Sequence, residues 1–214
     1  MLFLHIPKNA GTSIREATGL RETGHQPLRW WGKGLFYQKV DTTADIFAAV
    51  RNPYDRIISI FYFLKKAHEN KKSLYQHRIR RDFARMTEFA NVNDFIDALY
   101  HFPQRFKHLA TDDERNRFVL WQTQCFYYPQ VDFLNDGDGQ PISDKIKHIL
   151  RCERLGQDWS EMMTRNGYNQ LPHKNKSKLR PATPWQDELT AESIAKIGEL
   201  YADDFEHLNY ERIS

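Results

Sequence analysis

The chain has few cysteines, little net charge and no long apolar run, and each of these features argues against one class of protein. Its 214 residues contain two cysteines, Cys125 and Cys152, so no disulfide framework is indicated and a reducing compartment is the simpler expectation. No stretch approaches the roughly 20 apolar residues of a membrane-spanning helix. The net charge is only +3, with both signs interleaved, and does not predict a nucleic-acid partner.

The apolar content is sufficient for one ample core. Hydrophobic residues make up 40% and aromatic residues 14% of the chain, which predicts a single domain over residues 1–214. The pattern of the first third predicts a strand at residues 2–6, a helix at 13–18, a strand at 46–50 and a helix at 54–68. This order is typical of a βαβ unit and predicts an α/β fold with a short parallel sheet flanked by helices. In the second helix, Arg56 and Ser59 fall outside the apolar face and are expected at the surface.

The rest of the chain continues the pattern. Helical spacing recurs around residues 95–100 and 118–125, and a third strand is expected at 146–152. A helix at about 158–165 is closed by Gly167, and a final helix follows Thr190, its predicted N-cap, with an apolar stripe that runs to Phe205.

A small, cationic turn joins the first expected strand to the first helix. Gly11 has no side chain, and Ala10 and Ser13 have small ones, so backbone N–H groups can approach a phosphate closely. The helix N-terminus and Lys8 supply positive charge. The turn therefore predicts an anion-binding loop of the P-loop type.

The order of residues argues against a nucleoside triphosphate with magnesium. A Walker A loop places its lysine after the glycines, whereas here Lys8 precedes Gly11. The second strand should then end in an acidic residue that helps to hold Mg²⁺, but it ends in Arg51. No set of His, Cys, Asp and Glu has metal-ligand spacing either. The two loops predict a metal-free site for a ligand with two separate anionic groups.

Both loops resemble those of one enzyme family. Residues 5–13, HIPKNAGTS, resemble the 5′-phosphosulfate loop of the sulfotransferases, and residues 51–59, RNPYDRIIS, resemble their 3′-phosphate segment. The likeness is greatest to the carbohydrate sulfotransferases of the Golgi type, which include the heparan and chondroitin enzymes, and to their bacterial relatives. It covers most of the chain and is strongest in the two loops.

The resemblance implies a donor, a set of donor-binding residues and a P-loop-like fold. The family's donor is 3′-phosphoadenosine 5′-phosphosulfate (PAPS), and no metal is needed. Its reaction is an in-line displacement in which an acceptor hydroxyl attacks sulfur, and Lys8 would stabilise the departing 5′-phosphate. The implied acceptor is a carbohydrate. The implied donor-binding residues are Lys8, Asn9, Ala10, Gly11, Thr12 and Ser13 on the first loop, Arg51 and Ser59 on the second, and Lys174 and Lys176 on a late basic loop.

The acceptor hydroxyl needs a general base, for which two residues compete. His25 follows the first helix, where the family's carbohydrate enzymes often carry a histidine, and an unperturbed imidazole titrates near neutral pH. Glu22 is the alternative, because other sulfotransferases use a glutamate from this region. Trp30 and Trp31 either stack on a sugar or pack in the core.

Two other functions remain open from the sequence alone: a non-enzymatic protein that binds 3′-phosphoadenosine 5′-phosphate (PAP), and a nucleotide-dependent kinase. Because the donor loop begins at Pro7, no signal peptide is expected ahead of it. A native Met1 predicts a bacterial cytoplasmic protein, and a removed anchor would predict the Golgi lumen. Nothing in the sequence indicates an oligomeric state.

Overall fold

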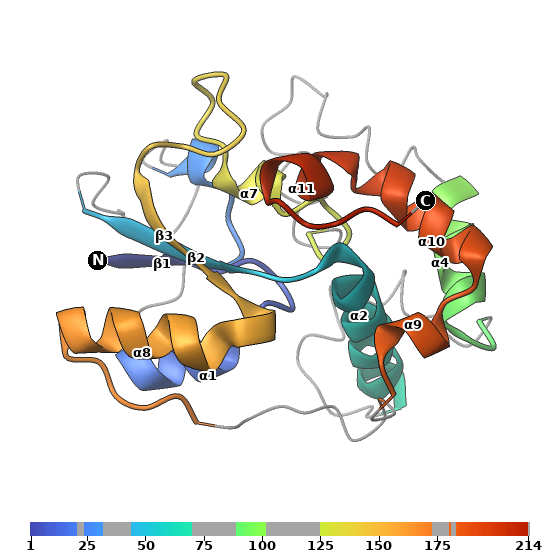
Figure 1. The fold of residues 1–214 in the computed structure, drawn as a ribbon, viewed down its shortest axis with the longest axis horizontal. Coiled ribbons are helices and arrows are strands. Elements are labelled where there is room, and N and C mark those ends of the chain that lie inside the picture. The colour runs from blue at the N-terminus through green and yellow to red at the C-terminus, as the bar shows by residue number, and fades with distance from the viewer. Residues whose placement is uncertain are drawn as a thin grey trace. The chain divides into compact units, whose positions relative to one another are not determined.

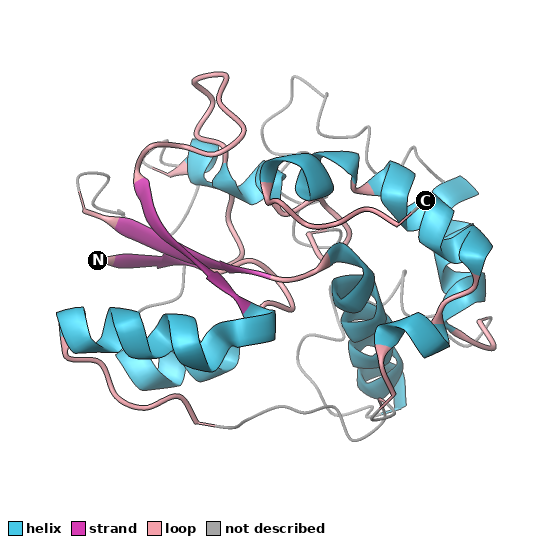
Figure 2. Cartoon of the chain, in the orientation of Figure 1, coloured by secondary structure: helices cyan, strands magenta, loops and turns pink. Residues whose placement is uncertain are grey.

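The computed structural model describes residues 1–20, 24–31, 44–69, 89–101, 125–172, 180 and 183–213 (Figures 1 and 2). The chain divides into two compact units. The first unit comprises Met1–Asn52, Pro129–Lys176 and Glu206–Tyr210, and the second comprises Pro53–Tyr128, Ser177–Phe205 and Glu211–Ser214. The expectation of a single domain stays a prediction.

The first unit is built on a parallel sheet in the order β1-β2-β3, with β1 at Leu2–Leu4, β2 at Ile46–Val50 and β3 at Ile146–Arg151. All five residues of β2 are buried. An uninterrupted apolar strand is what the centre of a parallel sheet requires, because both of its faces are covered. The predicted α/β class and short parallel sheet are confirmed.

Helices α1 (Gly11–Thr18) and α8 (Leu155–Asn166) lie along one face of this sheet, as Figure 1 shows. They begin two and three residues earlier than the sequence predicts. Their core contacts with the sheet bury several large side chains, each of which contributes about 1.5–3 kcal/mol. The cluster contains Phe3, Ile14, Ala17, Phe47, Ala49, Leu150, Trp159 and Met162. Gly167 follows α8 with φ of 67°, the left-handed conformation of a helix C-cap.

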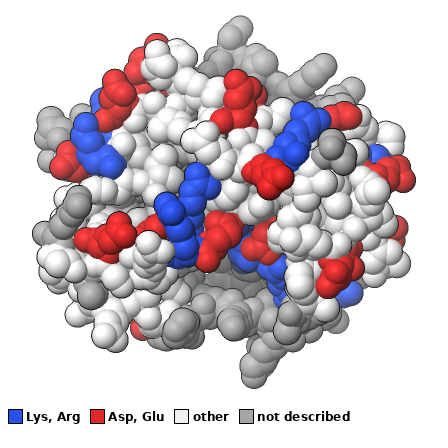
Figure 3. All heavy atoms as spheres, viewed as in Figure 1, with Lys and Arg blue, Asp and Glu red and all other residues white. Residues whose placement is uncertain are grey.

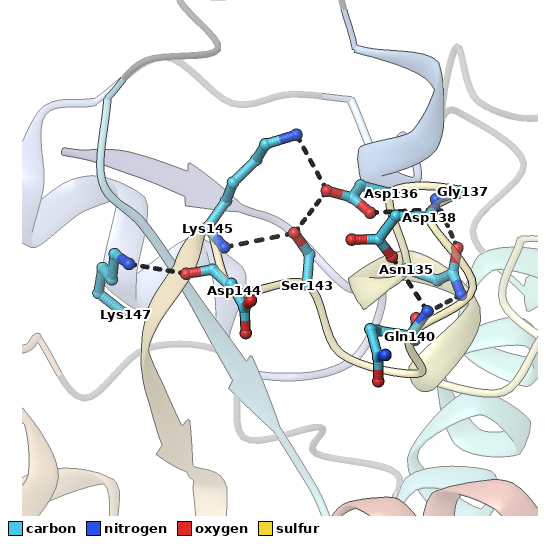
Figure 4. Close-up of polar contacts among 9 residues, drawn as sticks. All are labelled: Asn135, Asp136, Gly137, Asp138, Gln140, Ser143, Asp144, Lys145 and Lys147. Carbon is cyan, nitrogen blue, oxygen red and sulfur yellow. Dashed lines mark hydrogen bonds and ion pairs between the residues drawn. The ribbon is translucent and has the colours of Figure 1, made fainter.

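A hydrogen-bonded loop connects the short helix α7 (Val131–Leu134) to β3, as Figure 4 shows. Oδ2 of Asp136 accepts hydrogen bonds from the Ser143 hydroxyl at 2.6 Å and from Lys145 Nζ at 2.9 Å. The bond from Ser143, with the one from Lys145, holds the pKa of Asp136 well below its usual range. Hydrogen bonds of the Asp136 carboxylate thus contribute to the order of this exposed loop, and the side chains of Asn135 and Asp138 accept further bonds from its backbone. The helix that precedes this loop is bonded as well: Arg29 of the 3₁₀ turn η1 (Leu28–Trp30) donates from Nη1 to the carbonyl of Asp132 in α7 at 2.9 Å.

The second unit is helical. Its longest helix, α2 (Pro53–Glu69), packs against α4 (Val92–His101), α9 (Trp185–Glu188) and α10 (Ala191–Leu200). Helix α4 confirms the helical spacing at 95–100, whereas residues 118–124 of the other expected middle helix lie outside the described residues.

The final helix does not run continuously as predicted. Thr190 is its N-cap, as expected, and its hydroxyl accepts a hydrogen bond from the Ser193 N–H at 3.2 Å. However, α10 ends at Leu200 and α11 (Ala202–His207) starts after a break at Tyr201. Tyr201 is buried and donates its hydroxyl to the Tyr127 carbonyl at 3.0 Å. Its backbone leaves the helical conformation at the residue that makes this long-range contact.

Arg56 is buried, and the expectation of a surface position is wrong. Only 1% of the residue is exposed, and its guanidinium donates to the carbonyls of Tyr128 at 2.8 Å and Phe126 at 3.3 Å. These carbonyls belong to a segment outside the helices and strands, and buried carbonyls there need donors from other parts of the protein. Cys125 lies in the same interior, where burial raises the pKa of its thiol to about 12 against the opposing charge of Arg56.

The described surface mixes acidic and basic side chains over the face drawn in Figure 3, in keeping with the small net charge. Within the described ranges, no helix combines the length and hydrophobicity needed to cross a bilayer.

Candidate active site

The loop after β1 has an unusual backbone. Lys8 and Ala10 have φ of 69° and 58°, in the left-handed region that costs a residue with a side chain about 1–2 kcal/mol. Ala10 is directly followed by Gly11 in the first turn of α1. Alternating left- and right-handed residues turn successive N–H groups toward one concavity, which binds anions. The N–H groups of Ser13 and Ile14 bond to the Ala10 carbonyl, while those of Gly11 and Thr12 precede the first bond of the helix.

Gly11 is required by a close neighbour. A methyl group at residue 11 would lie 1.8 Å from Nε2 of His5, so the imidazole occupies the space of the missing side chain. His5 is 8% exposed, and its ring stacks on Phe3 with a centroid distance of 5.5 Å. The sequence assigns Gly11 to the approach of a phosphate, and the structure adds this packing requirement.

His25 is held beside the loop by its own ring nitrogen. Nδ1 lies 3.0 Å from the carbonyl oxygen of His5, and the two imidazole centroids are 4.1 Å apart. Because a carbonyl can only accept, Nδ1 carries the proton in this bond, and the lone pair of the neutral ring is then on Nε2. Gly24 and His25 both have left-handed backbones, with φ of 66° and 60°, which bring the imidazole back toward the loop. Glu22 lies outside the described residues.

Asn9 faces the interior. It is 0% exposed, and Nδ2 donates to the Ala49 carbonyl at 2.8 Å and to Oε1 of Gln130 at 2.7 Å. The sequence grouped Asn9 with the donor contacts. In the structure its side chain is buried and ties the loop to β2 and to Gln130.

Arg51 is held on both of its backbone groups by Gln130. Oε1 of Gln130 accepts from the Arg51 N–H at 2.9 Å, and Nε2 donates to the Arg51 carbonyl at 2.8 Å. The next residue, Asn52, donates its N–H to Oε1 of Glu153 at 2.5 Å. Sequence analysis did not single out Gln130 for the site. The available signal was a glutamine directly ahead of the largely apolar segment VDFL that begins at Val131.

The two cationic loops meet at the carboxyl edge of the sheet. Arg51 donates from Nη1 to the Lys8 carbonyl at 3.2 Å. The strands β1 and β2 are parallel, so the loops that follow them emerge at the same edge, where α/β proteins bind their ligands. Lys8 and Arg51, the two cations that the sequence assigns to one site, both belong to the first unit.

The end of the third strand, β3, contributes further contacts at this edge. The 3₁₀ turn η4 (Cys152–Arg154) follows β3 and carries Glu153, whose Oε2 accepts from the Tyr210 hydroxyl at 3.1 Å. Arg151 lies 4.6 Å from the Tyr210 ring centroid, and it donates to the Leu208 carbonyl at 2.5 Å. Burial, with the charge of Glu153, raises the pKa of Tyr210 far above its usual range.

For the other residues predicted to bind the donor, the structure gives only their position and exposure. Thr12 is exposed, so its hydroxyl is accessible at the start of α1, whereas Ser13 is buried. Ser59 is half-buried on α2, in the second unit. Lys174 and Lys176 lie outside the described residues.

The fold and the edge loops define an α/β protein with a P-loop-like strand, loop and helix. Within that class, a sequence model of the Sulfotransferase family matches residues 1–211, and the chain belongs to this family. It is therefore an enzyme that transfers a sulfuryl group, and the relationship to carbohydrate sulfotransferases is consistent with the match. No curated protein and no solved structure gives a significant match.

Proposed function

We propose that the enzyme transfers a sulfuryl group from PAPS to a hydroxyl group of a carbohydrate by a metal-free in-line displacement. The observation that carries the proposal is the joining of two cationic loops, with Nη1 of Arg51 bonded to the Lys8 carbonyl. PAPS has anionic groups on both the 5′ and the 3′ side of its ribose, and two cationic loops held together match this pair. The carbohydrate acceptor rests on the resemblance of the loops. Trp30 and Trp31 are buried and lend it no support.

The first loop would act on the 5′ side of the donor. The N–H groups of Gly11 and Thr12 and the hydroxyl of Thr12 would bind the 5′-phosphate at the positive end of α1. Lys8 would stabilise the oxygen that leaves with the phosphate, where charge grows in the transition state. Ala10 and Ser13 would contribute through the backbone of the turn.

The second loop would act on the 3′ side. The guanidinium of Arg51 is a planar fork with five donors, which suits a phosphate group and distinguishes this donor from adenosine 5′-phosphates. Gln130 fixes the backbone of Arg51, so the guanidinium side chain extends from a fixed position. Ser59, Lys174 and Lys176 are proposed as further 3′-phosphate contacts on the resemblance alone.

His25 is proposed as the general base. The hydrogen bond of Nδ1 to the His5 carbonyl sets the tautomer that takes a proton on Nε2. Glu22 remains the alternative for this role.

Ligand-dependent thermal stability tests the donor. In magnesium-free buffer, PAP at 100 times its Kd should stabilise the protein by about 2.7 kcal/mol, which is about 5–10 °C for a chain of this size. Adenosine 5′-monophosphate (AMP) at the same concentration should give a smaller shift. A larger shift by ATP with magnesium than by PAP would refute the proposal.

Turnover of PAPS tests the base. His25→Ala should lower the sulfuryl transfer rate by about 10²–10⁴-fold and leave PAP binding within about twofold of wild type. His101→Ala, at an exposed histidine of α4, is the matched control and should change neither quantity. An unchanged rate in His25→Ala together with a large loss in Glu22→Gln would move the role to Glu22.

A further inference from the structure

We propose that Gln130 is a positioning residue that holds the two donor loops at the separation that the donor requires. The inference rests on the proposed function, because it assigns a consequence to the distance between the 5′ and 3′ contacts. It is carried by one buried side-chain amide that bonds to both loops: to Asn9 of the first and to Arg51 of the second.

The amides of Asn9 and Gln130 extend the sheet beyond the end of β1. Strand β1 pairs with β2 as far as Leu4 and Ala48. Past this point, the Ala49 carbonyl accepts from Asn9, and both backbone groups of Arg51 bond to Gln130. Residues two apart on a strand present their backbone groups to the same neighbour. Side-chain amides therefore take the ladder positions that β1 vacates where it turns into the anion-binding loop.

One oxygen atom connects the two loops. Oε1 of Gln130 accepts from Asn9 Nδ2 at 2.7 Å and from the Arg51 N–H at 2.9 Å. Asn9 lies between the two left-handed residues of the first loop, Lys8 and Ala10. A displacement of either loop is thus transmitted to the other through this amide, as well as through the direct bond from Arg51 to the Lys8 carbonyl. Gln130 itself is 0% exposed.

The position of Gln130 is fixed by the helix that it precedes. Three of the four residues of α7 are buried: Val131, Phe133 and Leu134. The backbone of α7 also accepts the hydrogen bond from Arg29 at Asp132. The Gln130 amide therefore extends from a backbone position that is fixed by packing. A residue that sets the separation of the two loops must be fixed in this way.

Held at a fixed separation, two phosphate sites bind a bisphosphate as one ligand, because engaging the first site presents the second phosphate at high effective concentration. Loosening the separation removes this advantage and leaves each site able to bind its own phosphate. Loss of Gln130 should therefore weaken the bisphosphate selectively.

The test compares three ligands in wild type and in Gln130→Met, which keeps the side-chain length without polar atoms. PAP carries both phosphates, AMP the 5′-phosphate and adenosine 3′-monophosphate the other. Isothermal titration should show PAP weakened by about 10- to 100-fold and each monophosphate by less than about threefold. Gln140→Met is the matched control: Gln140 is exposed, its hydrogen bonds are made by its backbone, and all three affinities should be unchanged.

Two further results decide the interpretation. Equal weakening of all three ligands in Gln130→Met, with a PAP preference in wild type, would overturn the positioning role and leave the proposed function intact. A wild-type enzyme that binds PAP no better than AMP would instead overturn the proposed function. Hydrogen exchange on the ligand-free wild type is independent of any variant: the Arg51 amide should be protected, and fast exchange there would refute the bond to Gln130.

Discussion

Replacing Gly11 with alanine perturbs the contact between the anion-binding loop and His5. The new methyl group would lie 1.8 Å from Nε2 of His5, whereas carbon and nitrogen atoms in contact are about 3.4 Å apart. The imidazole would have to withdraw by about 1.6 Å to restore an ordinary contact. It has little room to do so, because it is 8% exposed, stacks on Phe3 and lies against His25.

Overpacking of this kind destabilises a protein by about 1–3 kcal/mol. The gain in helix propensity from glycine to alanine, at most about 1 kcal/mol, offsets part of this loss. We expect Gly11→Ala to lower the free energy of unfolding by about 1–2 kcal/mol, measured by urea denaturation. At about 2–4 °C per kcal/mol, the Tm should fall by about 2–8 °C.

A double-mutant cycle identifies the ring as the cause. His5→Ala removes the imidazole and keeps the carbonyl that binds His25, so Gly11→Ala introduced into that background should cost less than about 0.5 kcal/mol. Gly19→Ala is the control: it introduces strain at φ of 65°, with nothing within 4 Å of the added carbon, and should show no coupling to His5. If Gly11→Ala is equally costly with and without the ring, the clash is not the reason for the glycine.

Two further predictions concern stability. Asp136→Asn should cost about 1–2 kcal/mol at pH 7 because the carboxylate loses charge-assisted bonds from Ser143 and Lys145. Since the folded pKa of Asp136 lies below the unfolded value, its contribution is complete above about pH 4 and is lost as the pH falls through the folded pKa, so urea denaturation should show the gap between variant and wild type closing in acid. Arg56→Met should cost about 2–5 kcal/mol because it removes the two hydrogen bonds that the buried guanidinium donates to the Tyr128 and Phe126 carbonyls, and an unfolding free energy within 0.5 kcal/mol of wild type would contradict the burial of the guanidinium.

Local patterns predicted the fold class and placed Lys8 and Arg51 directly after neighbouring strands. The apolar run at Ile46–Val50 became the central strand with the expected bounds, because a buried parallel strand needs an unbroken apolar sequence. The residue that follows it, Arg51, is joined to Lys8 because parallel strands end at one edge. These inferences depend on short-range order and on a general rule of sheet topology, and both can be read from a sequence.

Contacts between distant residues were not predicted. Gln130 bonds to Arg51 across 79 positions and to Asn9 across 121, separations for which periodicity carries no information. Arg56 was misplaced because its helical position was judged against the apolar face of its own helix. The buried partners of Arg56 are carbonyls of a segment outside the helices and strands, and no sequence pattern predicts that contact.

Gly11 is a position at which two explanations make different predictions. If the glycine serves the approach of a phosphate, Gly11→Ala should weaken PAP binding even in the His5→Ala background. If it serves the packing of His5, the added methyl group points at the space that the ring has left, and PAP affinity in that background should match that of His5→Ala alone. The geometry favours the second outcome, because the missing side chain would point directly at the His5 ring, 1.8 Å from Nε2. A loss of PAP affinity that persists without the ring would instead show that the phosphate itself approaches residue 11 too closely for any side chain.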